Sequence, residues 1–160
     1  MRTVTTRTTV YKFEELTDAA KESALAHLYD INVDHDWWKC VYDDAKTIGC
    51  EIRAFDTGRS NSIDLRCPNA HQTAILIVEN HGETCDTMKL ADEYLKDFDK
   101  LDRGEDGELA DEIEKEFARA LGEEYLSILR TEYEYQTSEE AIKETIEAND
   151  FDFTKEGRIF

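Results

Sequence analysis

Apolar residues recur every three or four positions along most of this chain, the spacing that places them on one face of a helix. Thr17 precedes the first such segment and Asn69 the third, and both have the side chain of a helix N-cap. Gly49 ends the second segment, where a left-handed residue commonly closes a helix. Residues 74–78 are apolar on nearly every side. Their periodicity alone also fits a buried strand, but we expect a buried helix. These predicted helices cover residues 18–31, 34–49 (with a start near Asp34 or Asp36), 70–81 and 84–101.

The longest periodic segment is predicted to form one helix over residues 108–136, with an apolar residue at every fourth position. Gly122 lies inside this segment and is expected to weaken the helix by about 1 kcal/mol relative to Ala. Residues 137–140 have the form of a capping box for a last helix over 138–149. The stripe of the long helix consists of Leu109, Ile113, Phe117, Leu121, Tyr125, Leu129 and Tyr133.

Strands are predicted where β-branched and aromatic residues gather or where apolar and polar residues alternate. Residues 3–13 form the first such segment, and 50–55 and 62–67 are predicted to pair as a hairpin. In the segment 50–55 the alternation places Ile52 with Ala54 and leaves Phe55 as an exception. Residues 151–160 are expected to form a small terminal hairpin with Gly157 in its turn.

The predicted fold class is α+β: a small antiparallel sheet packed by helices, with a long acidic helix and a helical C-terminal half. A chain of 160 residues has the size of one domain. We therefore expect a single domain over residues 1–160. Its mixed α/β part covers 1–91, and its acidic helical part covers 92–160 and ends in the short hairpin.

Charge is the feature that bears most on function. The chain carries 38 Asp and Glu against 19 Lys and Arg, a net charge of −19, of which −14 falls in residues 92–160 and −5 in residues 1–91. This charge excludes direct nucleic-acid binding through a basic patch and disfavours an anionic membrane surface. It favours either solubility or attraction to a basic partner.

The chain contains no apolar run of about 18 residues and no apolar signal core at its start, so we expect no membrane span and a cytoplasmic location. The four cysteines, Cys40, Cys50, Cys67 and Cys85, match neither a CxxC pair nor a zinc knuckle. In a reducing compartment they are expected to be buried small hydrophobes, not ligands or disulfides.

Sequence motifs for catalysis are absent: there is no phosphate-binding glycine loop, no GxSxG and no HExxH. The residues His81, Glu83 and Cys85 are the best metal-like cluster, but a helix end explains His81 equally well. Two weaker candidates are an acid–base group at His35, Asp36, Asp43 and Asp44, and a calcium loop at Asp102, Asp106 and Glu108. We therefore expect no enzyme, no catalytic residue, no metal and no cofactor.

The acidic side chains on and before the long helix are the predicted partner-binding site. Carboxylates three or four positions apart on a helix stand about 5–6 Å from one another, broadly the spacing of phosphates along DNA. A rigid helix can therefore display a phosphate-like row to a protein that grips DNA. A solvated face of an ordinary acidic protein explains the same charges, and the aromatic residues Trp37, Trp38 and 133–135 are an alternative anchor. The predicted binding residues are Asp97, Asp99, Asp102, Glu105, Asp106, Asp111, Glu112, Glu116, Glu123 and Glu124.

Four segments resemble a group of small acidic proteins encoded by phages and prophages, some of them labelled antitoxin-like. The segments are residues 11–24 (YKFEELTDAAKESA), 36–49 (with DWW and YDDAKTIG), 79–85 (ENHGETC) and 132–149 (with EYEY and TSEEAIKETIEAN). The resemblance spans nearly the whole chain, implies a mobile-element origin and supplies no catalytic residues.

By analogy of charge and size with DNA-mimic anti-CRISPR and anti-restriction proteins, we expect an inhibitor of a host defence nuclease complex in the bacterial cytoplasm. Its partner would be a basic host nucleic-acid-binding protein or effector complex. The alternative is an antitoxin or adaptor that neutralises a basic protein.

Overall fold

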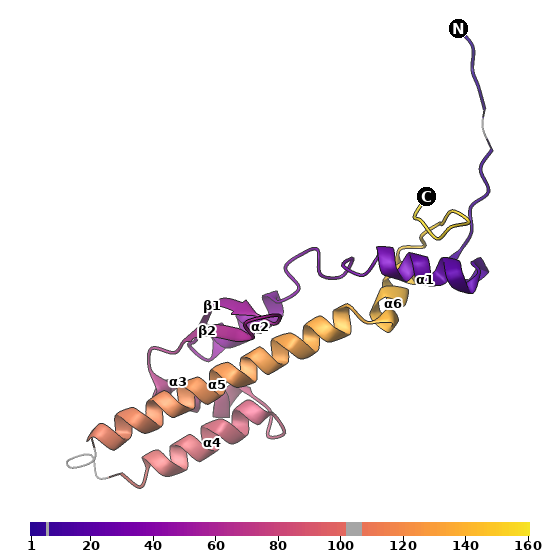
Figure 1. Ribbon diagram of the computed structural model, residues 1–160. Coiled ribbons are helices and arrows are strands. Elements are labelled where there is room, and N and C mark those ends of the chain that lie inside the picture. Colours follow the sequence, from indigo (N-terminus) through magenta and orange to yellow (C-terminus); the bar gives the residue numbers. More distant parts are fainter. Residues whose placement is uncertain (6, 102–106) are drawn as a thin grey trace. The chain divides into compact units, whose positions relative to one another are not determined.

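The computed structural model describes residues 1–5, 7–101 and 107–160. Its architecture is α+β, as the sequence predicts: helices accompany one two-stranded antiparallel sheet in the described part of the chain (Figure 1). The elements are the 3₁₀ turn η1 (Phe13–Glu15), α1 (Asp18–His27), α2 (Lys39–Thr47), β1 (Glu51–Asp56), β2 (Ser62–Arg66), α3 (Ala70–Asn80), α4 (Asp86–Phe98), α5 (Gly107–Gln136) and α6 (Glu139–Ala148).

The chain divides into two compact units. The terminal unit contains residues 1–37 and 133–160, and the central unit contains residues 38–132. The two parts expected from the sequence, 1–91 and 92–160, therefore each contribute to both units. All of α2, both strands, α3, α4 and most of α5 belong to the central unit.

The hairpin of the central unit forms as predicted, with one irregularity that explains Phe55. A β-bulge between Ile52 and Ala54 shifts the register, so Ile52 pairs with Leu65 and Phe55 with Ile63. The extra residue carries Ala54 to the exposed face and returns Phe55 to the face of Ile52. Strict alternation had placed Ala54 with Ile52, and the bulge corrects that prediction.

The prediction that all four cysteines are buried and reduced is wrong. Cys50 and Cys67 form a disulfide between the residue before β1 and the residue after β2. Cys40 and Cys85 are exposed. Spacing alone gave no sign of the bond, because the hairpin pairing is what places its two cysteines opposite each other.

Aromatic rings hold α3, α4 and α5 together within the central unit. Tyr94 of α4 stacks on Phe117 of α5 with ring centroids 4.6 Å apart. His71 of α3 lies 4.8 Å from Phe98 of α4. Gly122 is buried where α5 meets β2: a Cβ there would lie 3.5 Å from the Ile63 side chain, so the hairpin approaches the helix backbone closely. This packing fixes which sides of α4 and α5 remain open to solvent.

The terminal unit has its own core, in which Phe153 is fully buried against residues of α1 and α6. Among the described residues of the segment 3–13 no strand forms, and only Tyr11 makes a bridge, with Phe153. The terminal turn forms as predicted: Phe153 also bridges Ile159, and Gly157 adopts a φ of 80°. Residues 3–5 and 7–10 are mostly exposed, so their β-branched side chains have no sheet to pack on.

Helix starts agree with the sequence in two cases and differ in three. Thr17 and Asn69 accept hydrogen bonds from the helix backbone, as expected of N-caps. In the last helix Ser138 caps the backbone N–H of Ala141, so the four residues 137–140 do not form the expected capping box. The helix α4 begins at Asp86, two residues later than expected, and α2 begins at Lys39, which leaves Trp37 outside the helix.

Candidate functional site

The exposed side of α5 carries part of the predicted acidic row. Glu112, Glu116 and Glu123 are all exposed, and their spacings of four and seven residues place them on one side of the helix. Asp111 is exposed on a neighbouring side, and Asp99 is exposed at the C-terminal end of α4. The predicted residues Asp102, Glu105 and Asp106 lie outside the described residues.

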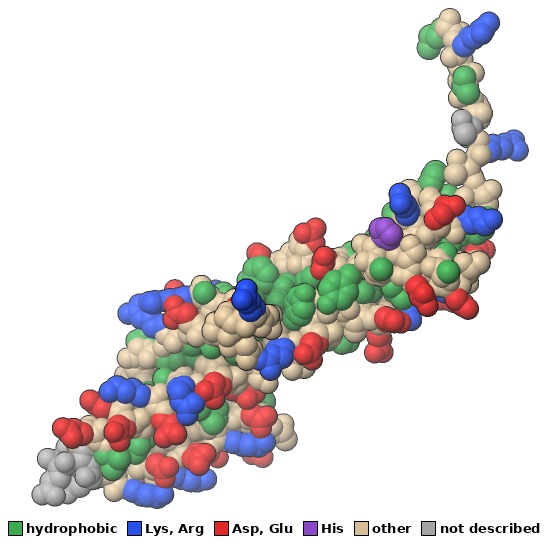
Figure 2. Space-filling model, viewed as in Figure 1, with side chains coloured by type: hydrophobic (Ala, Val, Ile, Leu, Met, Phe, Trp, Pro, Cys, Tyr) green, Lys and Arg blue, Asp and Glu red, His purple; other side chains and the backbone are tan. Residues whose placement is uncertain are grey.

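This row is not uniformly anionic. The guanidinium of Arg119 lies between two of its members, 2.6 Å from the Glu123 carboxylate and 3.8 Å from that of Glu116. Figure 2 shows carboxylates and Lys or Arg side chains next to one another over α4 and α5. Exposed ion pairs of this kind stabilise a protein by only about 0–1 kcal/mol, so a partner's cations can replace them. The structure therefore supports anionic clusters more than a continuous phosphate-like row.

Glu124 points to a different side of α5 from its neighbour Glu123, since successive helix residues are about 100° apart. It is partly buried, and burial raises the pKa of its carboxyl group. The nearby Asp86 carboxylate raises this pKa further, and the Lys89 ammonium opposes the rise. Glu124 is thus separate from the row formed by Glu112, Glu116 and Glu123.

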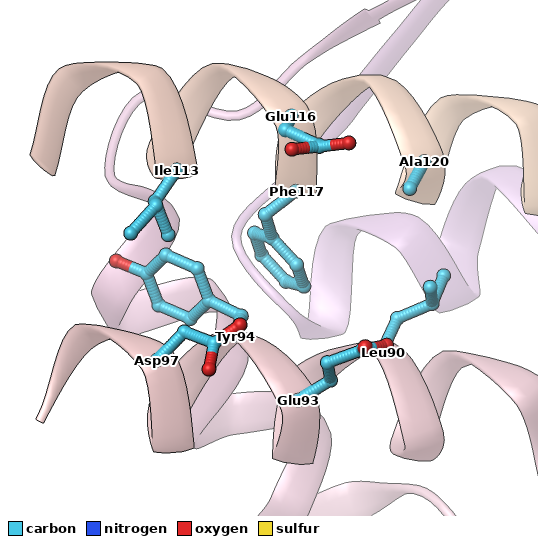
Figure 3. Close-up of a pocket in the computed structure, with 8 residues that line it drawn as sticks. All are labelled: Leu90, Glu93, Tyr94, Asp97, Ile113, Glu116, Phe117 and Ala120. Carbon is cyan, nitrogen blue, oxygen red and sulfur yellow. The ribbon is translucent and has the colours of Figure 1, made fainter. Parts of the chain in front are cut away.

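A groove between α4 and α5 brings two of the predicted residues together. It has a volume of about 240 Å³, and Figure 3 shows Asp97 of α4 and Glu116 of α5 on its two sides. Glu93, one turn before Asp97, adds a third carboxylate. The apolar lining comes from Leu90, Tyr94, Ile113, Phe117 and Ala120.

Tyr94 is the one buried polar residue of the groove. Tyr94 is only 4% exposed, and its hydroxyl oxygen has no hydrogen-bond partner within the described residues. Burial, with a contribution from the Glu114 carboxylate, raises the pKa of Tyr94 to about 12. Figure 3 shows the hydroxyl beside Ile113, in the space between the two helices. An unpartnered hydroxyl in a buried position is uncommon in folded proteins.

The carboxylates at the rim differ in their intrachain partners. The Asp97 carboxylate accepts a hydrogen bond from the Lys100 ammonium at 2.7 Å, on the exposed surface. Glu116 has only the 3.8 Å contact with Arg119, and Glu93 has no ion pair within the part of the chain described. An apolar lining with an anionic rim suits a long cationic side chain, whose stem is apolar and whose end is charged.

A second polar cluster lies where α2, α3, α4 and α5 meet. Tyr125 donates a hydrogen bond to the Asp44 carboxylate at 2.7 Å, and the other Asp44 oxygen is 3.6 Å from the buried Nε2 of His81. The Nδ1 of His81 shares a hydrogen bond with the Thr87 hydroxyl at 2.7 Å. The sequence singled out Asp44 and His81 for other reasons and did not connect them. A tyrosine in the apolar stripe of a buried helix was the available signal, because its hydroxyl needs a partner.

The metal-like cluster of the sequence is not assembled among the described residues, and the calcium-loop candidate is described only in part. Among the described residues no three His, Cys, Asp or Glu side chains converge as metal ligands, and Glu83 and Cys85 are exposed. Asp43 pairs with Lys46 at 3.0 Å on the surface, whereas Asp44 accepts from Tyr125. The calcium-loop candidate at Asp102 and Asp106 falls outside the described residues.

Some of the aromatic residues considered as an alternative anchor pack against other rings of their own unit. In the terminal unit the Trp37 and Tyr133 rings lie 5.6 Å apart, and in the central unit Trp38 lies 5.9 Å from Phe55. Only Tyr135 of these aromatic residues is exposed, at 47%. The groove therefore offers more free apolar lining beside charge than these rings do.

Sequence reasoning missed Glu93 and Tyr94. In the helix predicted over residues 84–101, Tyr94 lies three residues after Ala91 and four before Phe98, the spacing of one helix face. That spacing was the signal available for Tyr94. Nothing local distinguished Glu93 from other surface carboxylates.

No protein-family model, no curated protein and no solved structure matches this chain. Within residues 1–5, 7–101 and 107–160, no helix has both the length and the apolar character that crossing a membrane requires.

Proposed function

We propose that this protein is a non-enzymatic inhibitor that binds a basic, nucleic-acid-binding protein through α4 and α5 of its central unit. The observation that carries the proposal is that Glu93, Asp97 and Glu116, from two helices, line one groove together with apolar side chains. The net charge of −19 adds a long-range attraction that raises the rate of association with a basic partner.

The partner class follows from the same charges. A surface that attracts phosphate carries clustered Lys and Arg, and these are the groups that a carboxylate-rimmed groove accepts. Because Arg119 interrupts the row on α5, recognition depends on local clusters that meet individual cations. Imitation of a whole DNA strand is not required by this arrangement.

The more specific part of the proposal is that the partner is a host defence nuclease complex of the CRISPR or restriction type, met in the bacterial cytoplasm. It rests on the resemblance to phage and prophage proteins and on the charge and size of the chain. The Cys50–Cys67 disulfide bears on the location, since such bonds are rare in the cytosol. The oxidation state of this pair in host cells therefore tests the proposed compartment.

An antitoxin or adaptor for a basic protein is the second candidate, and the same acidic groove favours it. A toxin partner would be a small basic protein that forms a stable complex of fixed stoichiometry with this chain. A defence complex would instead lose nucleic-acid binding when this chain is added. Competition with nucleic acid thus separates the two candidates.

The experiment is a binding assay on purified defence nuclease complexes, with and without nucleic acid as competitor, at increasing salt. We expect binding to weaken steeply with salt, because exposed charges are screened over about 8–10 Å at physiological ionic strength. The triple variant Glu112→Lys, Glu116→Lys, Glu123→Lys should abolish binding.

The matched control changes the same number of charges elsewhere. Glu140, Glu147 and Glu156 are exposed residues of the terminal unit, and their replacement by Lys alters the net charge equally. If the α5 triple and this triple weaken binding alike, only overall charge matters and the site is wrong. Inhibition that persists at about 0.5 M salt and in the α5 triple would reject the mechanism.

A further inference from the structure

We infer that the groove between α4 and α5 is a receptor for a single arginine side chain of the partner. This inference rests on the proposed function and names the chemical group that the site recognises. The occupant lies with its aliphatic stem against the apolar lining and with its guanidinium among the three carboxylates.

The size of the groove favours one side chain. Pockets for small-molecule ligands commonly measure about 300–1,000 Å³, and this groove measures about 240 Å³. Its lining of Leu90, Ile113, Phe117 and Ala120 matches the methylene stem of a long side chain. An anionic ligand such as a nucleotide is excluded by the three carboxylates at the rim.

The rim favours a guanidinium over other cations. Glu93 and Asp97 lie one turn apart on α4, and Glu116 lies on α5, so acceptors from both helices line the groove (Figure 3). A guanidinium is planar and presents five N–H donors, and it binds carboxylates through paired hydrogen bonds. A lysine ammonium is a compact point charge with three donors, so it makes fewer hydrogen bonds than a guanidinium to carboxylates that are spread around the groove.

Tyr94 is the independent observation that points to a ligand. Its hydroxyl is shielded within the groove wall and has no partner among the described residues. The oxygen can accept a hydrogen bond from a guanidinium N–H. Ile113, which is half-buried, lies beside this hydroxyl in Figure 3.

The cations already present do not close the groove. Lys100 pairs with Asp97 at 2.7 Å, and its side chain is 73% exposed. Arg119 pairs with Glu123 more closely than with Glu116, at 2.6 Å against 3.8 Å. Exposed pairs of this kind exchange readily with a competing cation.

The test uses three blocked tripeptides, Gly-Arg-Gly, Gly-Lys-Gly and Gly-citrulline-Gly, titrated into the full chain and followed by amide NMR. We expect saturable shifts at Tyr94, Ile113 and Phe117 with the arginine peptide, weaker binding of lysine, and no saturable shift with uncharged citrulline. Citrulline keeps the shape of arginine and removes its charge, so it controls for apolar contact.

Two variants locate the site. Tyr94→Phe keeps the ring that stacks on Phe117 and removes only the hydroxyl, and we expect it to weaken the arginine peptide about tenfold, the effect of one hydrogen bond to a charged group. Glu93→Gln should weaken the same peptide, whereas Glu139→Gln, on α6 of the terminal unit, should leave it unchanged. The amide spectrum of each variant reports whether it remains folded.

The outcomes separate this inference from the proposed function. Shifts scattered over all exposed carboxylates, equal binding of lysine and arginine, or an unchanged affinity in Tyr94→Phe each overturn the arginine receptor. The salt-dependent complex with the basic nuclease can survive those results, and the proposed function then stands. Failure of that complex to form, with the arginine peptide still bound in the groove, rejects the proposed function alone.

Discussion

Tyr125 donates its hydroxyl hydrogen to the Asp44 carboxylate at 2.7 Å, joining two residues 81 positions apart in the sequence. Tyr125 is fully buried in α5, whereas the Asp44 side chain on α2 remains 48% exposed. The bond thus satisfies a buried donor with an acceptor that still contacts water. Burial is the main cause that raises the pKa of Tyr125 above its ordinary value, and the hydrogen bond to Asp44 raises it further.

Replacing Tyr125 with Phe removes this hydrogen bond and keeps the packed ring. We expect the free energy of unfolding to fall by about 1–2 kcal/mol, because the bond involves a charged acceptor that water can solvate again. Urea denaturation followed by circular dichroism measures the change. Tyr42→Phe is the control: Tyr42 is a half-buried residue whose hydroxyl has no carboxylate acceptor among the described residues, and its replacement should change stability by less than about 0.5 kcal/mol.

Gly157 occupies a position that no other residue fits. Its φ is 80°, and a Cβ there would lie 2.1 Å from the Ala20 carbonyl oxygen. Gly157→Ala should therefore destabilise the terminal unit by about 3 kcal/mol or more. Hydrogen exchange at the α1 amides should rise in the variant.

Gly107→Ala serves as the matched substitution, since a Cβ at Gly107 meets none of the described residues within 4 Å. It should leave stability unchanged or raise it by up to about 1 kcal/mol, the difference in helix propensity. Equal effects of the two substitutions would contradict the contact at Ala20.

The disulfide predicts a thiol count. The folded, non-reduced chain should react with a thiol reagent at two cysteines, Cys40 and Cys85, and the reduced, unfolded chain at four. Mass spectrometry of the alkylated protein reads this number directly. Four reactive thiols without reductant would show that Cys50 and Cys67 are not joined.

Reduction should also lower stability without any change of sequence. The bond closes a loop with a sequence separation of 17, for which chain entropy predicts a contribution of about 3 kcal/mol. Urea denaturation of the same preparation with and without a phosphine reductant measures it. The double variant Cys50→Ala, Cys67→Ala should be insensitive to the reductant.

Glu124 should make stability depend on pH with a defined sign. Its pKa is raised in the folded state by burial and by Asp86, so its contribution to stability is present below its ordinary pKa of 4.5 and is lost as pH rises through the raised value. Glu124→Gln should therefore be more stable than the parent at pH 7, and this advantage should vanish near pH 3. Denaturation at both pH values provides the comparison.

The neighbouring substitution Glu123→Gln gives the contrast. Glu123 is exposed and pairs with Arg119 at 2.6 Å, so its loss should cost about 0.2–0.5 kcal/mol at pH 7. A gain in stability from Glu123→Gln as large as that from Glu124→Gln would show that general charge repulsion, and not the position of Glu124, is responsible.

Local sequence patterns predicted which helices and strands are present better than they predicted the residues at which those elements begin and end. The helical period located α3 and the full length of α5, and the chemistry of Thr17 and Asn69 placed two helix starts correctly. The strand expected over residues 3–13 does not form among the described residues of that segment, because β-branched composition requires a neighbouring strand and only Tyr11 of them makes even an isolated bridge. Propensity describes a residue's preference, whereas a strand exists only when it is paired.

Two of the four candidate-site residues discussed above could also be predicted from the sequence. Asp97 and Glu116 were expected to bind a partner because both lie in the acidic half of the chain, and the structure brings them to one groove. Glu93 and Tyr94 were missed because their role depends on how α4 packs against α5. The Arg119 pairs, which interrupt the expected row, depend on side-chain geometry in the same way.

The sequence by itself determined the net charge, its concentration in residues 92–160, and the helices whose apolar faces must be buried, since these depend on composition and on a period of 3.6 residues. Only the tertiary structure decided that Cys50 meets Cys67, that a bulge turns Phe55 inward, and that the buried Tyr94 lines the same groove as three carboxylates. Each of these features either brings together residues that are distant in the sequence or depends on the register in which β1 pairs with β2. The physical reason is that a helical period is a local property of the backbone, whereas such meetings are set by how whole elements pack.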